Sequence, residues 1–252
     1  MNGGFMKKGV NDFLLPNTGS VNAFRNENNR KVELANGVLQ IEWEIVSAIT
    51  QIPDIHWLVA SHVQTIHEYH RQALTMAMSN RPEIGMAVMR LACELTRDLC
   101  RIAEEPTRAD LWLQYRSPDG HSRHGKDYKR VFRFSTDDGT EKAIYDLYNM
   151  FSNFGVHGHL PMTQNLAMAK EIDGQNYMMV RRDPKTAITT FMLTLMCADL
   201  HSVLMLSKFK SAADGSNNHV REYFGALGMT YMERMSPFHR YVEIYRAKDG
   251  HC

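Results

Sequence analysis

The sequence predicts a mainly α protein: a helical bundle with one or two small β-hairpins. Apolar residues recur at three- and four-residue intervals over several long stretches, which is the period of one buried helix face. The 252 residues are 44% hydrophobic and 23% charged, an ordinary balance for a globular core of this size. Four cysteines in a chain this long do not form a disulfide framework.

The first 35 residues are predicted to be a flexible N-terminal arm, because residues 1–30 are rich in Asn and Gly and show no apolar period. Residues 36–252 then form a single helical domain. The N-terminus lacks the apolar run of a secretion signal, and the most apolar run, residues 187–198, is too short to span a bilayer. We therefore expect a cytoplasmic protein without a membrane partner. The balance of 29 basic and 28 acidic side chains argues against a highly basic surface for duplex DNA.

Four helices are predicted in the first half of the domain. The first runs from Asn36 until the helix-breaking Pro53, and the second from a capping Asp54 to about Asn80. The third begins at Pro82, and a short fourth covers residues 109–115. The stripe that the third helix is predicted to turn inward comprises Ile84, Val88, Leu91, Leu95 and Leu99.

The middle of the chain is expected to contain a loop, two helices and a hairpin. Residues 116–125 have the composition of a loop, and residues 126–134 suit a helix. Asp138 with Glu141 resembles a capping box at the start of a helix that ends near residues 155–158. Asp-Gly at 173–174 favours a two-residue turn, which predicts a hairpin over 165–182.

Two further helices are predicted near the C-terminus. Asp183-Pro184 opens a long helix that is apolar nearly all round and ends at about Lys208. Another helix follows residue 218. Residues 229–246 suit either a second hairpin or a helix, and the alternation in Tyr241-Val-Glu-Ile-Tyr245 favours the hairpin.

Three histidines of the second helix raise the question of a metal site. His67-Glu-Tyr-His70 is one residue shorter than the HExxH pattern that places two ligands on one helical turn. We therefore expect His62, His67 and His70 at the surface or in an interface, and we expect no metal and no other cofactor. The chain also lacks a Gly-rich phosphate loop and a G-x-S-x-G motif, which disfavours nucleotide-dependent enzymes and serine hydrolases.

A basic stretch with interleaved aromatic residues is one candidate for function. Such a pattern can follow a phosphate backbone while an aromatic ring stacks on a base, so RNA is the expected partner. The alternative interpretation is a solvated charged face. The residues are Arg123, Lys126, Tyr128, Lys129, Arg130, Phe132 and Arg133.

A second candidate joins two distant helices. The segment Val88-Met-Arg-Leu-Ala-Cys-Glu-Leu-Thr-Arg97, followed by Tyr148-Asn-Met-Phe-Ser-Asn-Phe-Gly-Val-His157, resembles the HEPN-like helical proteins of bacteria, which include abortive-infection relatives and groups without assigned function. Those proteins share an Arg-x-x-x-Glu helix and a later helix ending Ser-x-x-x-x-His. The resemblance covers about residues 55–210. It implies a helical bundle, often a homodimer, and in active members a metal-independent endoribonuclease.

The resemblance also suggests roles for individual residues. His157 and Asn153 take the family's histidine and polar places, whereas Ser152 stands where the family has arginine. Because serine cannot supply the positive charge that stabilises a phosphorane, we expect Arg90, oriented by Glu94, to replace that arginine. His157 would exchange protons during attack by a ribose 2′-hydroxyl.

Two interpretations of these residues stay open. The first is a ribonuclease of defence or toxin type. The second is a non-catalytic dimeric interaction or regulatory module. In that module Ser152, Asn153 and His157 would satisfy one another and Glu94 as a buried polar cluster, since buried polar groups need partners whether or not they react.

Overall fold

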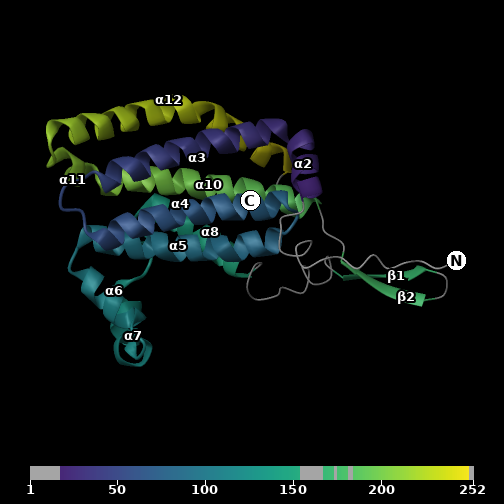
Figure 1. The fold of residues 1–252 in the computed structure, drawn as a ribbon, viewed down its shortest axis with the longest axis horizontal. Helices are drawn as coiled ribbons and strands as arrows, with labels where there is room; N and C mark the ends of the chain where they lie inside the picture. Colours follow the sequence, from purple (N-terminus) through teal and green to yellow (C-terminus); the bar gives the residue numbers. More distant parts are fainter. Residues whose placement is uncertain (1–17, 154–166, 173–174, 181–183, 250–252) are drawn as a thin grey trace.

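The described part of the chain is a bundle of long helices with a small β-hairpin at one end, which confirms the mainly α prediction (Figure 1). This computed structural model describes residues 18–153, 167–172, 175–180 and 184–249. The helices are α2 (Thr18–Glu27), α3 (Asn29–Thr50), α4 (Trp57–Met78), α5 (Pro82–Glu104), α6 (Arg108–Arg116), α7 (Gly120–Val131), α8 (Gly139–Phe151), α10 (Pro184–Lys208), α11 (Lys210–Asp214) and α12 (Asn218–Asp249).

Helix α10 is the central element, and α3, α4, α5 and α8 all contact it (Figure 1). Phe191 and Leu195 of α10 are both 0% exposed. The helix has the bounds and the nearly all-round burial that its sequence predicts. By length and composition α10 would also suit a membrane span, but 72% of its most apolar window is buried inside the protein in this structure.

Helix α5 begins at Pro82 as predicted, and Leu99 of the predicted apolar stripe is buried. Leu91 is 46% exposed and Ile84 is 41% exposed, so the stripe is wrong at these two positions. Much of the first half of the face that packs against the bundle consists instead of small and sulfur-containing residues, including Gly85, Met89 and Cys93. A Cβ at Gly85 would lie 3.0 Å from the Ala73 carbonyl oxygen of α4. Small residues therefore let the two helices approach closely, which hydrophobicity alone does not reveal.

The predicted flexible arm is wrong for residues 18–35, which form α2 and the start of α3. The ring of Phe24 lies 5.0 Å from the ring of Phe191, and Val32 and Ala35 are buried in the same core. These apolar residues recur at helical intervals, but Asn-rich surroundings obscure the pattern. Residues 1–17 lie outside the described residues.

The predicted second hairpin at 229–246 is also wrong, because α12 continues to Asp249 as one helix with Pro237 inside it. The buried residues repeat every three or four positions, which is the period of a helix and not of a strand. The apparent alternation at 241–245 is too short to outweigh this longer period. The buried residues are Val220, Phe224, Leu227, Tyr231, Met235, Phe238 and Val242.

The β-hairpin consists of β1 (Ala167–Ile172) and β2 (Gln175–Val180), which pair antiparallel with Ile172 opposite Gln175. It lies within the range 165–182 that Asp-Gly at 173–174 predicts, and it projects from one end of the bundle (Figure 1). The two turn residues lie outside the described residues.

The helix starts follow the predicted capping chemistry in one case and not in another. The Asp138 side chain accepts hydrogen bonds from the Thr140 and Glu141 backbone N–H groups, as predicted. Helix α4 is capped instead by His56, whose Nδ1 accepts from the Leu58 N–H. Asp54 lies before the helix and has a positive φ of 59°.

Most of the predicted loop at 116–125 is helical, because α7 begins at Gly120. A Cβ at that position would lie 1.9 Å from the Gln114 carbonyl oxygen, so only glycine fits where α7 leaves α6. The contact places the two helices as a pair beside α5, at the side of the bundle (Figure 1).

Candidate functional site: a cationic aromatic pocket

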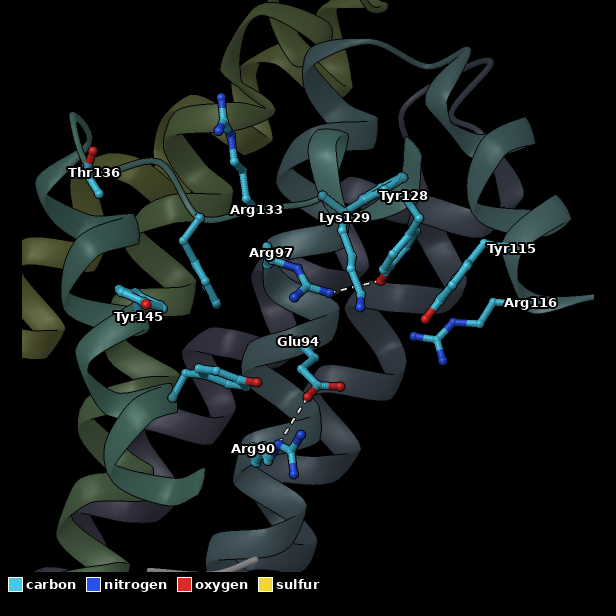
Figure 2. A pocket seen from close by; sticks show the side chains of 13 residues that line it. Arg90, Glu94, Arg97, Tyr115, Arg116, Tyr128, Lys129, Arg133, Thr136 and Tyr145 are labelled. Carbon is cyan, nitrogen blue, oxygen red and sulfur yellow. Dashed lines mark hydrogen bonds and ion pairs between the residues drawn. The ribbon is translucent and has the colours of Figure 1, made fainter. Parts of the chain in front are cut away.

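A pocket of about 580 Å³ lies between α5, the α6–α7 pair and α8 (Figure 2). Among the described residues, its lining combines cationic and aromatic side chains with one carboxylate, that of Glu94. The cationic residues are Arg90, Arg97, Arg116, Lys129 and Arg133. The aromatic residues are Tyr115, Tyr128, Phe132, Phe134, Tyr145 and Tyr148.

Helix α5 supplies Arg90, Glu94 and Arg97, which are four and three residues apart and therefore lie on one face. Arg90 Nε donates to Glu94 Oε1 over 3.1 Å, so the expected pair forms. The Arg90 guanidinium also lies 5.8 Å from the centroid of the Tyr148 ring on α8, within cation–π range. These contacts orient Arg90 at the pocket wall instead of leaving it on the surface alone.

Asp98 of α5 links three helices that line the pocket, α5, α6 and α7, through its carboxylate. Its carboxylate is 0% exposed and accepts hydrogen bonds from Trp112 Nε1 of α6 at 2.9 Å and the Tyr128 hydroxyl of α7 at 2.6 Å. It also pairs with Arg97 Nη2 at 2.7 Å. Burial, together with this carboxylate, raises the pKa of Tyr128 well above its usual range, so the hydroxyl stays a donor. We call these four residues the Asp98 cluster.

Stacked rings form the α6–α7 side of the pocket. The Tyr115 and Tyr128 rings lie 3.8 Å apart with an interplanar angle of 8°, and the Arg116 guanidinium lies over both. Tyr128 is only 5% exposed, so it cannot itself stack on a base as its sequence position suggests. Tyr115 is likewise occupied, since it packs against Tyr128 and His121, whereas Tyr145 is 38% exposed and is better placed to stack on a base.

The predicted RNA-binding stretch divides between the pocket and the outer surface. Lys129 and Arg133 line the pocket and have no ion-pair partner among the described residues. Arg123 and Arg130 are about three-quarters exposed, pair with Asp119 and Asp127 respectively, and lie outside the lining. Lys126 is also exposed outside the pocket. Lys129 lies on α7, whereas Arg133 follows the end of that helix at Val131, so the turn of the chain after α7 brings Arg133 to the pocket.

The end of α8 does not supply the predicted partners of Arg90 within the described residues. Ser152 is 8% exposed, its hydroxyl has no described hydrogen-bond partner, and Asn153 is exposed. Neither lines the pocket, so the predicted polar cluster of Ser152, Asn153 and Glu94 is wrong for these three residues. His157 lies outside the described residues.

Several pocket residues escape the sequence prediction, notably Arg97, Arg116 and the two tyrosines of α8. A signal for Arg97 exists, since it follows Arg90 by seven positions and so shares its helix face. No comparable signal links Arg116 to α5, because its place depends on how α6 packs.

The three α4 histidines were expected at the surface or in an interface, but two of them are buried inside the bundle. His62 is 2% exposed and His70 is 0% exposed. His62 packs edge-on against the Trp112 ring, with 4.9 Å between ring centroids. His70 and the partly buried His67 both contact the carboxylate of Glu42 on α3.

No protein-family model, curated protein or solved structure matches the chain. The resemblance to HEPN-like proteins stays a prediction.

Proposed function

We propose that the protein binds single-stranded RNA in the pocket and, with His157, cleaves it without a metal ion. The observation that best supports this is the composition of the pocket lining. Among the described residues that line it, five are cationic and lie among aromatic rings, and Glu94 supplies the one carboxylate. The pocket volume of about 580 Å³ suits a nucleotide-sized group. Cations that attract phosphate and rings that stack on bases are the usual components of single-strand binding.

The roles of the side chains follow from their partners. Lys129 and Arg133 lack described ion-pair partners, so they can neutralise phosphates without first breaking an ion pair. Tyr145, which is 38% exposed, offers ring surface for a base. Arg97 donates hydrogen bonds to Asp98 and Tyr128, so we assign it a structural role in the pocket lining and not a contact with the ligand.

The proposed reaction is an intramolecular transesterification. The ribose 2′-oxygen forms a bond to the adjacent phosphorus as the bond from phosphorus to the 5′-oxygen breaks, and the 2′-hydroxyl proton leaves to a base while the 5′-oxygen gains one. The products are a 2′,3′-cyclic phosphate and a 5′-hydroxyl. Arg90, oriented by Glu94, would stabilise the charge on phosphorus, and His157 would transfer the protons.

A salt titration of RNA binding tests the pocket. For single strands, each neutralised phosphate contributes about 0.7 to the slope of log affinity against log salt. We expect Lys129→Gln with Arg133→Gln to reduce that slope by about 1.4. The matched control is Arg123→Gln with Arg130→Gln, which removes the same two charges from outside the lining. Equal losses in both double variants would show that general surface charge binds RNA, and not the pocket.

A cleavage assay separates the proposed enzyme from a second candidate, the non-catalytic dimeric module. That candidate is favoured by Ser152, which stands where HEPN-like nucleases have arginine. End-labelled RNA is incubated with the protein in excess chelator, with DNA of the same sequence as control. The enzyme proposal is supported if the unaltered protein gives products that end in a cyclic phosphate and His157→Ala and Arg90→Ala do not. Binding without cleavage supports the module, and cleavage unchanged in both variants contradicts the proposed mechanism.

A further inference from the structure

Four ionisable side chains from three helices meet inside the bundle, and none of them lines the pocket. Glu42 comes from α3, His67 and His70 from α4, and His201 from α10. The Nδ1 atoms of His70 and His201 lie 2.6 and 3.0 Å from Glu42 Oε1. His67 Nδ1 lies 2.9 Å from Glu42 Oε2. Three imidazoles therefore surround one carboxylate, and we call these four residues the Glu42 cluster.

The cluster is almost completely removed from solvent. Glu42 and His201 are each 1% exposed and His70 is 0% exposed. Burying such groups is unfavourable unless they are fully paired. The buried Nε2 atoms of His70 and His201 nevertheless make no well-aligned hydrogen bond among the described residues, although the His70 imidazole also interacts with the Cys197 thiol of α10. The burial of these two imidazole nitrogens is therefore not balanced by hydrogen bonds of the usual geometry.

We propose that Glu42, His70 and His201, together with His67, bind a divalent transition metal ion of the zinc class. One donor atom from each of Glu42, His70 and His201 already lies within 4.8 Å of the others. Donors around one zinc ion at about 2.0–2.2 Å are about 3.4 Å apart in a tetrahedron and at most about 4.4 Å apart. The separations of 2.6 and 3.0 Å between Glu42 Oε1 and the two Nδ1 atoms are shorter than this, so these donors would move apart to enclose an ion.

The donor chemistry selects the kind of ion. Imidazole nitrogens suit zinc, iron, copper and nickel, whereas magnesium and calcium prefer sites made of oxygen ligands alone. Glu42, His70 and His201 would supply three donors, and His67, which contacts the other Glu42 oxygen, would supply the fourth of a structural zinc site after turning toward the ion. Such an ion would join α3, α4 and the central α10, so its role would be to hold the bundle together and not to act in the pocket.

The competing explanation is an ion-free cluster in which the imidazoles donate hydrogen bonds to Glu42. In that state burial disfavours the charge on His70, but the adjacent Glu42 carboxylate raises the pKa of His70 to about 10 and keeps it protonated. A metal ion would take the place of that proton. The two states differ in whether the protein retains zinc.

The first test measures retained zinc. The purified full-length chain is stripped with a chelator, equilibrated with Zn²⁺ alone, freed of excess metal and assayed for metal content, with Mg²⁺ in a parallel sample. We expect about one Zn²⁺ per chain and no Mg²⁺. His70→Asn and His201→Asn place an amide N–H near the Nδ1 position, so they keep a hydrogen bond to Glu42 while removing a zinc ligand.

The matched control is His62→Asn, which replaces another buried histidine of α4 outside the cluster. Zinc that is lost in His70→Asn and His201→Asn but kept in His62→Asn supports the proposal. No retained zinc in the unaltered protein, or equal retention in all three variants, overturns it.

A second measurement decides the matter if the cluster variants do not fold. Co²⁺ replaces Zn²⁺ in the unaltered protein, and its visible absorption is recorded. A strong tetrahedral spectrum without a thiolate-to-cobalt band supports coordination by imidazole and carboxylate. A weak octahedral spectrum, or a thiolate band from the buried cysteine pair Cys93 and Cys197, overturns it.

Discussion

Replacing Asp98 with alanine should destabilise the protein strongly, because that carboxylate holds α5, α6 and α7 together. Asp98→Ala removes hydrogen bonds at 2.6, 2.7 and 2.9 Å and leaves the donors of Tyr128, Arg97 and Trp112 without their acceptor. Removing one partner of a buried charged network costs about 3–5 kcal/mol. Arg116, 40% exposed and 3.9 Å away, should add little.

Two milder variants divide the effect between charge and hydrogen bonding. Tyr128→Phe deletes the hydrogen bond donated to Asp98 and the one accepted from Arg97, and each hydrogen bond to a charged group is worth about 1.5–3 kcal/mol. Asp98→Asn keeps the shape but removes the charge, so it should fall between Tyr128→Phe and Asp98→Ala.

Urea unfolding followed by circular dichroism measures these differences from the midpoint at an unchanged m-value. For a chain of this size the melting temperature of Asp98→Ala should fall by about 6–20 °C. A loss below about 1 kcal/mol in Asp98→Ala would refute the claim that this carboxylate organises the pocket walls.

Three further predictions concern the core, the α6–α7 contact and pH. Phe191→Ala should lower the free energy of unfolding by about 3–5 kcal/mol, because it leaves a cavity beside Phe24 at the centre of the bundle. Gly120→Ala should cost about 1–3 kcal/mol, because its Cβ would meet the backbone oxygen of Gln114 at 1.9 Å. Burial lowers the pKa of His62 below its usual 6.5, although Asp98 partly offsets this. The unfolded chain therefore binds this proton more readily, and stability should fall as pH drops through 6.5, less so in His62→Gln.

Each of these predictions has a control and a result that would contradict it. Met229, which is 74% exposed, provides the comparison for Phe191: Met229→Ala should change stability by less than about 0.5 kcal/mol. Gly125, with nothing within 4 Å of its Cβ position, should tolerate alanine in the same helix, so equal costs at Gly120 and Gly125 would discount the steric argument. For His62, parallel pH profiles of the variant and the unaltered protein would show that this group does not titrate differently on folding.

The sequence predicts the mainly helical fold because helix signals are local. Pro82 and Asp183-Pro184 mark the starts of α5 and α10, and their three- to four-residue apolar spacing extends over many turns. The same period was present in α12, where the weak strand alternation at 241–245 led to a wrong prediction. The Arg90–Glu94 pair was also predictable, since both residues lie on one turn of the same helix.

Only the tertiary structure decided which side chains meet across helices. Small residues such as Gly85 set how closely α4 and α5 pack, and that distance determined which face of α5 is buried. Helix α7 and the segment that follows it place Lys129 and Arg133 in the same pocket lining as Arg90, while α10 brings His201 to Glu42 across 159 positions of sequence. The physical reason is that helix periodicity records a residue's own turn, whereas a site built between helices depends on packing that no single segment encodes.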